Sequence, residues 1–301
     1  MRVSCDDPAL RLTVETWLAE SRLVPPRPIL LTITLVDGPW AEVDSRRCLR
    51  QPDLALYYGP PDDCLRLVWR DGLGHAVIAA RAGTAGVEIT RAAARTPEGW
   101  LRPFLLLVVA ALLRGAGWNH IHAATAVDPR GRGWLIAGDS NAGKSTTAAL
   151  LASRGWSVGT DDTAFLAEGT SPVEVVGWHE PIALREGGYQ LLGFRGGQRL
   201  ERRRKTGFLP EELGGRWVER VVPGIIAIAA IHAGATSMEP LRPALAVADL
   251  LSWSLLFIVD ADGAQRHLEL VTRLAAQARC YRLRLGRDIF EHPDLLSGLV
   301  P

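Results

Sequence analysis

The sequence GDSNAGKS occupies residues 138–145 and decides the fold that we expect for this chain. Apolar residues 134–137 precede it, and the helix-forming residues 148–151 follow it. Between a strand and a helix, such glycines let backbone N–H groups close around a phosphate, and the helix presents its positive end to the same anion. Lys144 supplies a cation for the outer phosphates, and Ser145 a hydroxyl for Mg²⁺. The stretch therefore predicts a nucleoside triphosphate site in an α/β domain.

A tight turn without a ligand is the alternative for any glycine-rich stretch between a strand and a helix. The Lys-Ser pair, together with the flanking strand and helix, favours phosphate binding over that alternative. We therefore predict ATP as the bound nucleotide and Mg²⁺ as its metal ion. The residues expected to hold them are Gly138, Asp139, Ser140, Asn141, Ala142, Gly143, Lys144, Ser145 and Thr146.

Composition narrows the class of protein. The chain has 301 residues, of which 48% are hydrophobic, so it can form one large core or two domains. With 34 basic and 33 acidic residues its net charge is +1, which argues against nucleic acid or an anionic membrane as a partner. The apolar stretches 104–113 and 250–259 are about half as long as the roughly 20 residues that a membrane-spanning helix needs.

The cysteines and the N-terminus indicate a cytoplasmic protein. Cys5, Cys48, Cys64 and Cys280 are scattered without a C-x-x-C or zinc spacing, which is typical of reduced thiols. Residues 1–8 contain two aspartates and a proline where a secretory signal needs an apolar run.

The first 115 residues are predicted to form a small, strand-rich α+β module. Short apolar runs such as 29–36 and 65–69 alternate with turns. The stretch 101–114 is apolar without alternation and long enough for a buried helix. We place the domain boundary after that helix, so residues 1–115 form the first domain and residues 116–301 the phosphate-loop domain.

Within the second domain, apolar runs at 121–127 and 133–137 flank an Asp-Pro-Arg-Gly turn. They predict a β-hairpin whose second strand leads into the phosphate loop. Further strands are expected at 156–159, 225–231 and 281–285, and helices at 144–153, 243–259 and 263–278. The glycine- and arginine-rich segment 185–215 has weak periodicity, so we expect a mobile loop there.

Two adjacent carboxylates, Asp161 and Asp162, follow the strand 156–159, and Asp161 lies 17 residues after Lys144. We expect that strand beside the strand of the phosphate loop, with its carboxyl end on the same edge of the sheet. Adjacent residues at a strand end point to opposite sides, so one carboxylate can face Mg²⁺ and the other an acceptor hydroxyl. An Asx turn or a helix N-cap is the structural alternative for this pair.

Residues 121–166 resemble the catalytic core of HPr kinase/phosphorylase and its relatives. The resemblance is carried by His122, Gly138-Asp139-Ser140, Gly143-Lys144-Ser145, Arg154-Gly155-Trp156 and Asp161-Asp162. It implies a phosphate-loop domain with a sheet similar to that of phosphoenolpyruvate carboxykinase, and phosphorylation of a serine hydroxyl on a protein. The wider group includes kinases of peptide-biosynthesis clusters, some acting on lasso peptides, and kinases of free serine.

The same resemblance implies the roles of three side chains. Asp161 is similar to the general base that takes the serine proton, and Asp162 to a residue near the metal. His122 is similar to a histidine that lies close to the first aspartate and tunes its charge; on its own, it is typical of a core histidine. The chain departs from the dedicated HPr kinases at Asn141, where they have glycine, and at Thr146, where they have glutamate. In that family the reverse phosphorylase reaction is linked to a hexameric assembly and to a glycine-rich signature, of which this chain has only a loose echo at residues 184–188, so the resemblance does not imply that reaction.

Residues 199–207 form the densest cluster of cations in the chain. A solvated surface is one interpretation of this basic loop. The other is that one or two of its cations close over the triphosphate or the acceptor, with Lys205 and Arg204 as the candidates. The cluster lacks the interleaved aromatic residues of a nucleic-acid site.

Together these features predict an ATP- and Mg²⁺-dependent kinase that phosphorylates a serine hydroxyl on a peptide or protein. Lys144 and the loop amides hold the phosphates, Ser145 holds the metal, and Asp161 accepts the proton. Two alternatives stay open: a kinase for a small molecule such as free serine, and a nucleotide-binding regulator without transfer activity. The N-terminal module either recognises the acceptor or completes the fold, and the sequence leaves the oligomeric state open.

Overall fold

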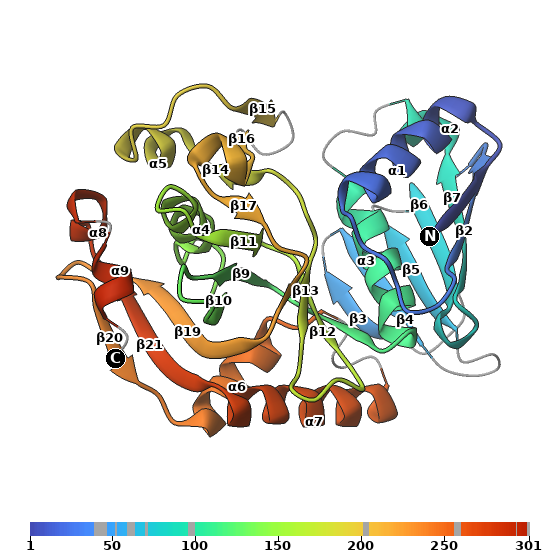
Figure 1. Cartoon of the computed structure of the whole chain (residues 1–301). Helices are drawn as coiled ribbons and strands as arrows, with labels where there is room; N and C mark the ends of the chain where they lie inside the picture. Colours follow the sequence, from blue (N-terminus) through green and yellow to red (C-terminus); the bar gives the residue numbers. More distant parts are fainter. Residues whose placement is uncertain are drawn as a thin grey trace. The chain divides into compact units, whose positions relative to one another are not determined.

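The computed structural model describes residues 1–38, 47–51, 53–58, 64–69, 72–95, 100–200, 205–255, 260–292 and 294–299. Its class is mixed α/β with several multi-stranded sheets, as expected (Figure 1). The chain divides into two compact units, Met1–Asn119 with Leu256–Ala264, and His120–Leu255 with Gln265–Pro301. The first unit thus includes a short segment from the second half of the chain. The predicted division at residue 115 assigned that segment to the second domain.

The first unit is built on a seven-stranded sheet in the order β1-β2-β7-β6-β5-β4-β3. Its strands are β1 (Arg2–Cys5), β2 (Leu30–Val36), β3 (Arg47–Gln51), β4 (Leu54–Tyr57), β5 (Leu65–Trp69), β6 (Gly74–Ala79) and β7 (Thr84–Thr90). β1, β2 and β7 are parallel neighbours, and the remaining pairings are antiparallel. Parallel neighbours need a crossover connection, and helix α1 (Pro8–Glu20) provides it between β1 and β2.

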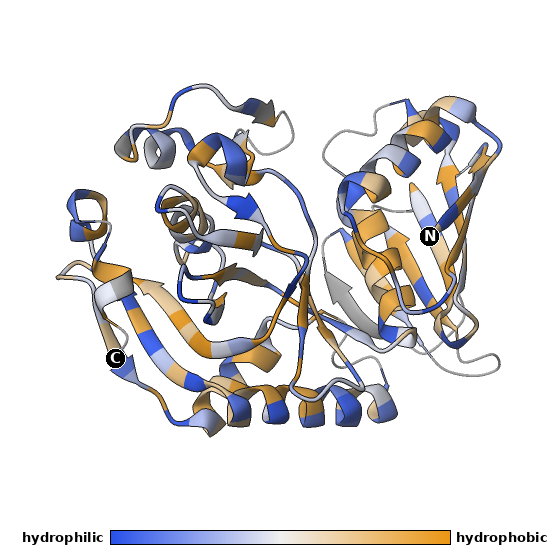
Figure 2. Ribbon diagram, viewed as in Figure 1, coloured by the Kyte–Doolittle hydropathy of each residue, from blue (hydrophilic) through white to orange (hydrophobic). Residues whose placement is uncertain are grey.

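The longest helices of this unit have clear local causes. α3 (Leu101–Gly115) is the buried helix predicted from its apolar sequence, and Figure 2 shows its hydrophobic character. α1, which the sequence analysis missed, begins after Asp7, whose Oδ1 accepts a hydrogen bond from the Leu10 N–H at 2.8 Å. The shorter helices are α2 (Arg91–Ala94) and the 3₁₀ helix η1 (Ala80–Ala82). Across the described residues, no helix has both the length and the apolar character needed to cross a membrane.

The second unit contains a seven-stranded sheet in the order β17-β11-β9-β10-β19-β21-β20. Its strands are β9 (Ala123–Val127), β10 (Gly133–Ala137), β11 (Ser157–Thr160), β17 (Arg216–Trp217), β19 (Pro223–Ile231), β20 (Ser237–Pro240) and β21 (Arg279–Leu285). The predicted hairpin is confirmed, since β9 and β10 pair antiparallel. The expectation that β11 lies beside β10 is wrong, because β9 lies between them. Because β9 pairs antiparallel with both β10 and β11, these two strands run parallel to each other and end at the same edge of the sheet.

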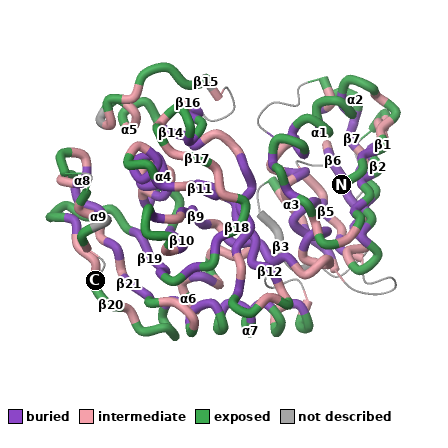
Figure 3. Tube along the Cα trace, in the orientation of Figure 1, coloured by how far each residue is buried: buried purple, intermediate pink, exposed green. Residues whose placement is uncertain are grey.

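Helices cover both faces of this sheet. Side chains alternate along β10, so Trp134 and Ile136 pack in one core with α4, whereas Leu135 and Ala137 pack in a second core with α6 and α7. The bounds of these helices are Lys144–Ala152 for α4, Pro243–Ser252 for α6 and Ala261–Gln277 for α7. The strands of the sheet are largely buried in Figure 3, and α7 alternates hydrophobic and hydrophilic residues in Figure 2. The α4 core and the α6–α7 core together fix β10 and therefore the start of the phosphate loop.

Two smaller sheets have the orders β18-β13-β12-β8 and β14-β16-β15. Their strands are β8 (Trp118–Ile121), β12 (Ala164–Ala167), β13 (Val175–Gly177), β14 (Ile182–Leu184), β15 (Gln198–Leu200), β16 (Lys205–Phe208) and β18 (Arg220–Val221). The loop predicted over 185–215 is wrong for the described residues, because β15, β16, α5 (Glu186–Leu191) and the 3₁₀ helix η3 (Pro210–Leu213) lie within it. The short helices α8 (Asp288–Glu291) and α9 (Leu295–Gly298) follow β21.

Candidate active site

The phosphate loop joins β10 to α4, and its backbone requires glycine at both ends. A Cβ on Gly138 would lie 2.5 Å from the carbonyl oxygen of Ala229, so no larger residue fits there. Gly143 precedes α4 with a φ of 96°, in the left-handed region that favours glycine. Asn141 is also left-handed, with a φ of 69°, and asparagine is among the residues that tolerate this conformation best after glycine. Asparagine in place of glycine at this position is therefore compatible with a left-handed loop residue.

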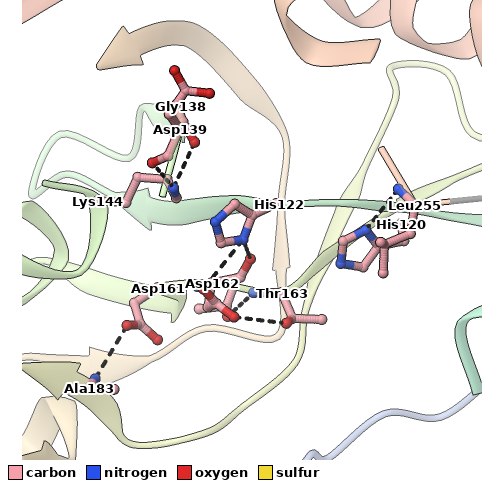
Figure 4. A network of polar contacts seen from close by, with 11 residues as sticks. His120, His122, Gly138, Asp139, Lys144, Asp161, Asp162, Thr163, Ala183 and Leu255 are labelled. Atoms are coloured by element: carbon pink, nitrogen blue, oxygen red, sulfur yellow. Dashed lines mark hydrogen bonds and ion pairs between the residues drawn. The ribbon is translucent and has the colours of Figure 1, made fainter. Parts of the chain in front are cut away.

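Lys144 is enclosed by this loop. Its Nζ donates hydrogen bonds to the carbonyl oxygens of Gly138 and Asp139, at 2.7 and 2.9 Å (Figure 4). Burial lowers the pKa of the Lys144 ammonium, whereas the carboxylates of Asp162, Asp161 and Asp139 act to raise it. The cation is therefore held where the loop backbone and three acidic side chains converge.

Asp161 directly follows β11 and is only 4% exposed. Its Oδ2 accepts a hydrogen bond from the Ala183 N–H at 3.3 Å. Burial, and then the charge of Asp162, raise the pKa of Asp161 to about 6, whereas the Ser145 hydroxyl acts to lower it. Asp161 thus joins the end of β11 to strand β14.

Asp162 has a different partner, His122. Nδ1 of His122 lies 3.3 Å from Oδ1 of Asp162 and 2.9 Å from its backbone carbonyl oxygen (Figure 4). A carbonyl oxygen only accepts, so Nδ1 is assigned the proton. The resemblance implied a histidine beside the first aspartate, Asp161, whereas Nδ1 of His122 contacts the second, Asp162. His122 also interrupts the strand predicted over 121–127, since β8 ends before it and β9 begins after it.

The turn that carries the two aspartates is made by a threonine. Oγ1 of Thr160 accepts hydrogen bonds from the backbone N–H groups of Asp162 and Thr163, both at 3.3 Å. This is the turn chemistry of a hydroxyl side chain. The turn therefore does not depend on an Asx turn made by the aspartates, and their carboxylates are available for Ser145, Ala183 and His122.

An open pocket of 690 Å³ brings the predicted residues together. The phosphate loop contributes Lys144, Ser145 and Thr146 to its wall, and His122 and Asp162 contribute from the neighbouring strand ends. Among the described residues, Asp161 is not part of this wall. Of the two candidates from the basic loop, Lys205 lines the pocket. Arg204 lies outside the described residues.

Sequence reasoning gave no role to three residues at or near this pocket. Arg185 lines it and lies in the segment predicted as a loop. Ile231 also lines the pocket and is 70% exposed at the end of β19. An apolar residue at the end of a strand does not by itself indicate a binding site in the sequence. Trp253 donates a hydrogen bond from Nε1 to Oδ1 of Asp139 at 2.8 Å, and its carbonyl oxygen accepts one from the His122 N–H. Only the folded chain brings Trp253 to the phosphate loop.

Metal binding by protein side chains alone is not indicated. Within the described residues, no group of three or more His, Cys, Asp or Glu is placed to hold a metal ion. Mg²⁺, however, is usually bound by one or two carboxylates together with substrate phosphates. No family model matches this chain, and no curated protein matches it significantly.

Proposed function

We propose that this protein is an HPr-kinase-like enzyme that uses ATP and Mg²⁺ to phosphorylate a serine hydroxyl on a peptide or protein. One observation carries the proposal: the phosphate loop meets a carboxylate pair, with Lys144, Ser145 and Asp162 on the wall of one pocket. Phosphoryl transfer needs positioned phosphates, compensation of their charge, and a base for the acceptor. The loop, the cations and the carboxylates can meet these three needs.

The residues present fit Mg²⁺ and a triphosphate. The charge of Asp162 disfavours ionisation of the buried Asp161, and a divalent cation offsets that cost. Ser145 and Asp161 offer oxygen atoms, the ligands that Mg²⁺ prefers, and the metal neutralises phosphate charge when bound. Lys144 is already inside the loop that would surround the phosphates. The arrangement thus supports a phosphate-loop domain of the HPr kinase type.

The contacts favour an exchange of the aspartate roles that the resemblance implies. Asp161 is buried, and the Ser145 hydroxyl acts on its carboxylate, so we assign it to the metal ion. Asp162 lies on the pocket wall and is oriented by His122, so we assign it the proton of the acceptor. In the transfer, the serine oxygen bonds to the terminal phosphorus, the bond from that phosphorus to the bridging oxygen of ADP breaks, and the serine proton moves to Asp162.

Transfer from γ-labelled ATP tests the proposal. The purified protein is incubated with labelled ATP, Mg²⁺ and, in separate reactions, serine-containing peptides or free serine. Label on peptide supports the proposal, and label on free serine alone identifies the small-molecule kinase instead. ATP binding without transfer to any acceptor would favour the regulator without transfer activity.

Two variants test the assigned roles. Asp162→Asn should lower kcat by about 100-fold or more and leave ATP affinity nearly unchanged, because loss of a general base affects transfer and not binding. Asp161→Asn should instead raise the Mg²⁺ concentration needed for activity. Glu186→Gln is the matched control, since Glu186 is an exposed carboxylate that accepts a hydrogen bond from Gln190 on α5. Full activity of Asp162→Asn would return the base to Asp161.

A further inference from the structure

Asp139 places a negative charge in the loop that we propose to bind phosphates. It is the second residue of this loop, and it is exposed. Its carboxylate acts to raise the pKa of the Lys144 ammonium, so it also lies within electrostatic reach of an anion that Lys144 would bind. A carboxylate turned toward the phosphates would repel them and weaken their binding. The direction in which the Asp139 side chain points therefore matters for the affinity of the loop.

The structure directs this carboxylate away from the pocket. In the described part of the chain, the wall of the pocket includes the next two residues of the loop, Ser140 and Asn141, but not Asp139. The carbonyl oxygen of Asp139 accepts a hydrogen bond from Nζ of Lys144 at 2.9 Å, so its backbone faces the cation. Its carboxylate points away from the two aspartates that follow β11 (Figure 4).

Trp253 holds the carboxylate in this direction. Its Nε1 donates a hydrogen bond to Oδ1 of Asp139 at 2.8 Å. The backbone of Trp253 is fixed at the end of α6, because its N–H donates to the Leu250 carbonyl oxygen and its carbonyl oxygen accepts from the His122 N–H at 2.9 Å. Trp253 also packs against the α6–α7 core. An indole N–H only donates, so this contact fixes the direction of the carboxylate and leaves its charge unchanged.

We propose that Trp253 is an electrostatic positioning residue, which keeps the Asp139 carboxylate out of the space that nucleotide phosphates occupy. The proposal rests on the proposed function in taking a nucleotide as the ligand of the loop. From outside the pocket, the carboxylate still acts to raise the pKa of Lys144 and so favours its charged form. The indole thus allows the loop to carry an acidic residue and to bind an anion.

A double-mutant cycle on nucleotide binding tests this role. The Kd of non-hydrolysable β,γ-imido-ATP with Mg²⁺ is measured by titration calorimetry on the full chain. Trp253→Phe keeps an aromatic ring but removes the donor, and it should raise the Kd by about 2- to 10-fold at low salt. In the Asp139→Asn background the same substitution should change the Kd by less than about 2-fold, because the side chain at position 139 then carries no charge.

Salt and a matched control separate an effect of charge from an effect of packing. At 1 M salt the Debye length is about 3 Å, so the effect of Trp253→Phe on the Kd should shrink to less than about 2-fold. Trp253→Phe combined with Asp249→Asn is the matched control. Asp249 is a carboxylate of α6 that pairs with Arg282 at 3.3 Å, so removal of its charge should not restore the affinity that Trp253→Phe loses.

Several results would overturn the proposal. An equal effect of Trp253→Phe in the native and the Asp139→Asn backgrounds, or an effect that persists at 1 M salt, would mean that the indole acts through packing alone. An unchanged Kd of Trp253→Phe at low salt would mean that the indole does not influence binding. A loss of more than about 10-fold in affinity on Asp139→Asn would mean that the carboxylate itself contributes to binding.

The cycle also distinguishes this proposal from the proposed function, because binding of the analogue needs neither an acceptor nor transfer. A protein that transfers no phosphate but shows the coupling between Trp253 and Asp139 would keep the positioning role and lose the kinase assignment. A protein that transfers phosphate without this coupling would keep the kinase assignment and lose the positioning role. A native protein that does not bind the analogue would lose both.

Discussion

Replacing Asp161 with asparagine should stabilise the folded protein at neutral and alkaline pH. Burial and the charge of Asp162 raise the pKa of Asp161 from 3.8 to about 6. Each pKa unit corresponds to about 1.4 kcal/mol, so ionised Asp161 costs the folded state about 3 kcal/mol at pH values well above 6. Asparagine has nearly the same shape and still accepts a hydrogen bond from the Ala183 N–H, but it carries no charge. The variant therefore avoids most of this cost.

The pH dependence has a definite sign. Below the unfolded pKa of 3.8, Asp161 is protonated in both states, and the variant gains nothing. Between pH 3.8 and about 6 the unfolded state ionises while the folded state keeps its proton, so the native protein loses stability that the variant keeps, and the loss is complete above about pH 6. Urea unfolding followed by tryptophan fluorescence, at about pH 4 and about pH 8 without nucleotide or Mg²⁺, measures the difference. A variant that is no more stable than the native protein at the higher pH would refute the reasoning.

Asp288 provides a control, because removal of its charge should change the free energy of unfolding in the opposite direction. Its carboxylate accepts hydrogen bonds from the backbone N–H and the hydroxyl of Thr236, and these lower the pKa of Asp288. The folded state therefore favours the ionised form, and Asp288→Asn should reduce stability at the higher pH. If both substitutions changed the free energy of unfolding in the same direction, the effect of charge removal could not come from the pKa values of these two groups.

Three further predictions concern the phosphate loop. Asn141→Gly should keep ATP affinity, whereas Asn141→Val should lower it, because a β-branched residue disfavours a φ of 69°; equal calorimetric affinities would contradict this. Gly138→Ala should abolish ATP binding, since its Cβ would lie 2.5 Å from the carbonyl oxygen of Ala229, and native-like affinity is the opposing result. Trp253→Phe removes the donor to Asp139 and should raise the Kd for ATP by about 2- to 10-fold, and an unchanged Kd would deny it a positioning role.

Local sequence was sufficient to predict the strand, loop and helix at residues 133–152, because these elements are consecutive in the chain and each has a recognisable residue pattern. The hairpin of β9 and β10 was predicted for the same reason, since its turn lies between two apolar runs. The position of β9 between β10 and β11 was not predicted. It depends on which strand edges meet in the folded sheet, and no residue spacing encodes that.

The small sheet β14-β16-β15 was missed for a different reason. Its strands have three or four residues, too few for alternation to show, and glycines such as Gly187 and Gly197 interrupt the pattern between them. The hydrogen-bond partners of the two aspartates are also far from them in the sequence. Ala183 is 22 residues from Asp161, and His122 is 40 residues from Asp162. The sequence showed that two carboxylates end one strand, but tertiary contacts decide which of them meets the serine and which the histidine.

Strand β9 sets the width of the space in which we propose that transfer occurs. Neighbouring strands lie about 4.8 Å apart, so two pairings separate the ends of β10 and β11 by about 10 Å. Helix α4 contacts both β9 and β11 and therefore spans that interval, with Ser145 in its first turn. If β11 lay directly against β10, the two strand ends would be about 5 Å apart. The antiparallel strand thus acts as a spacer between the phosphate loop and the two aspartates.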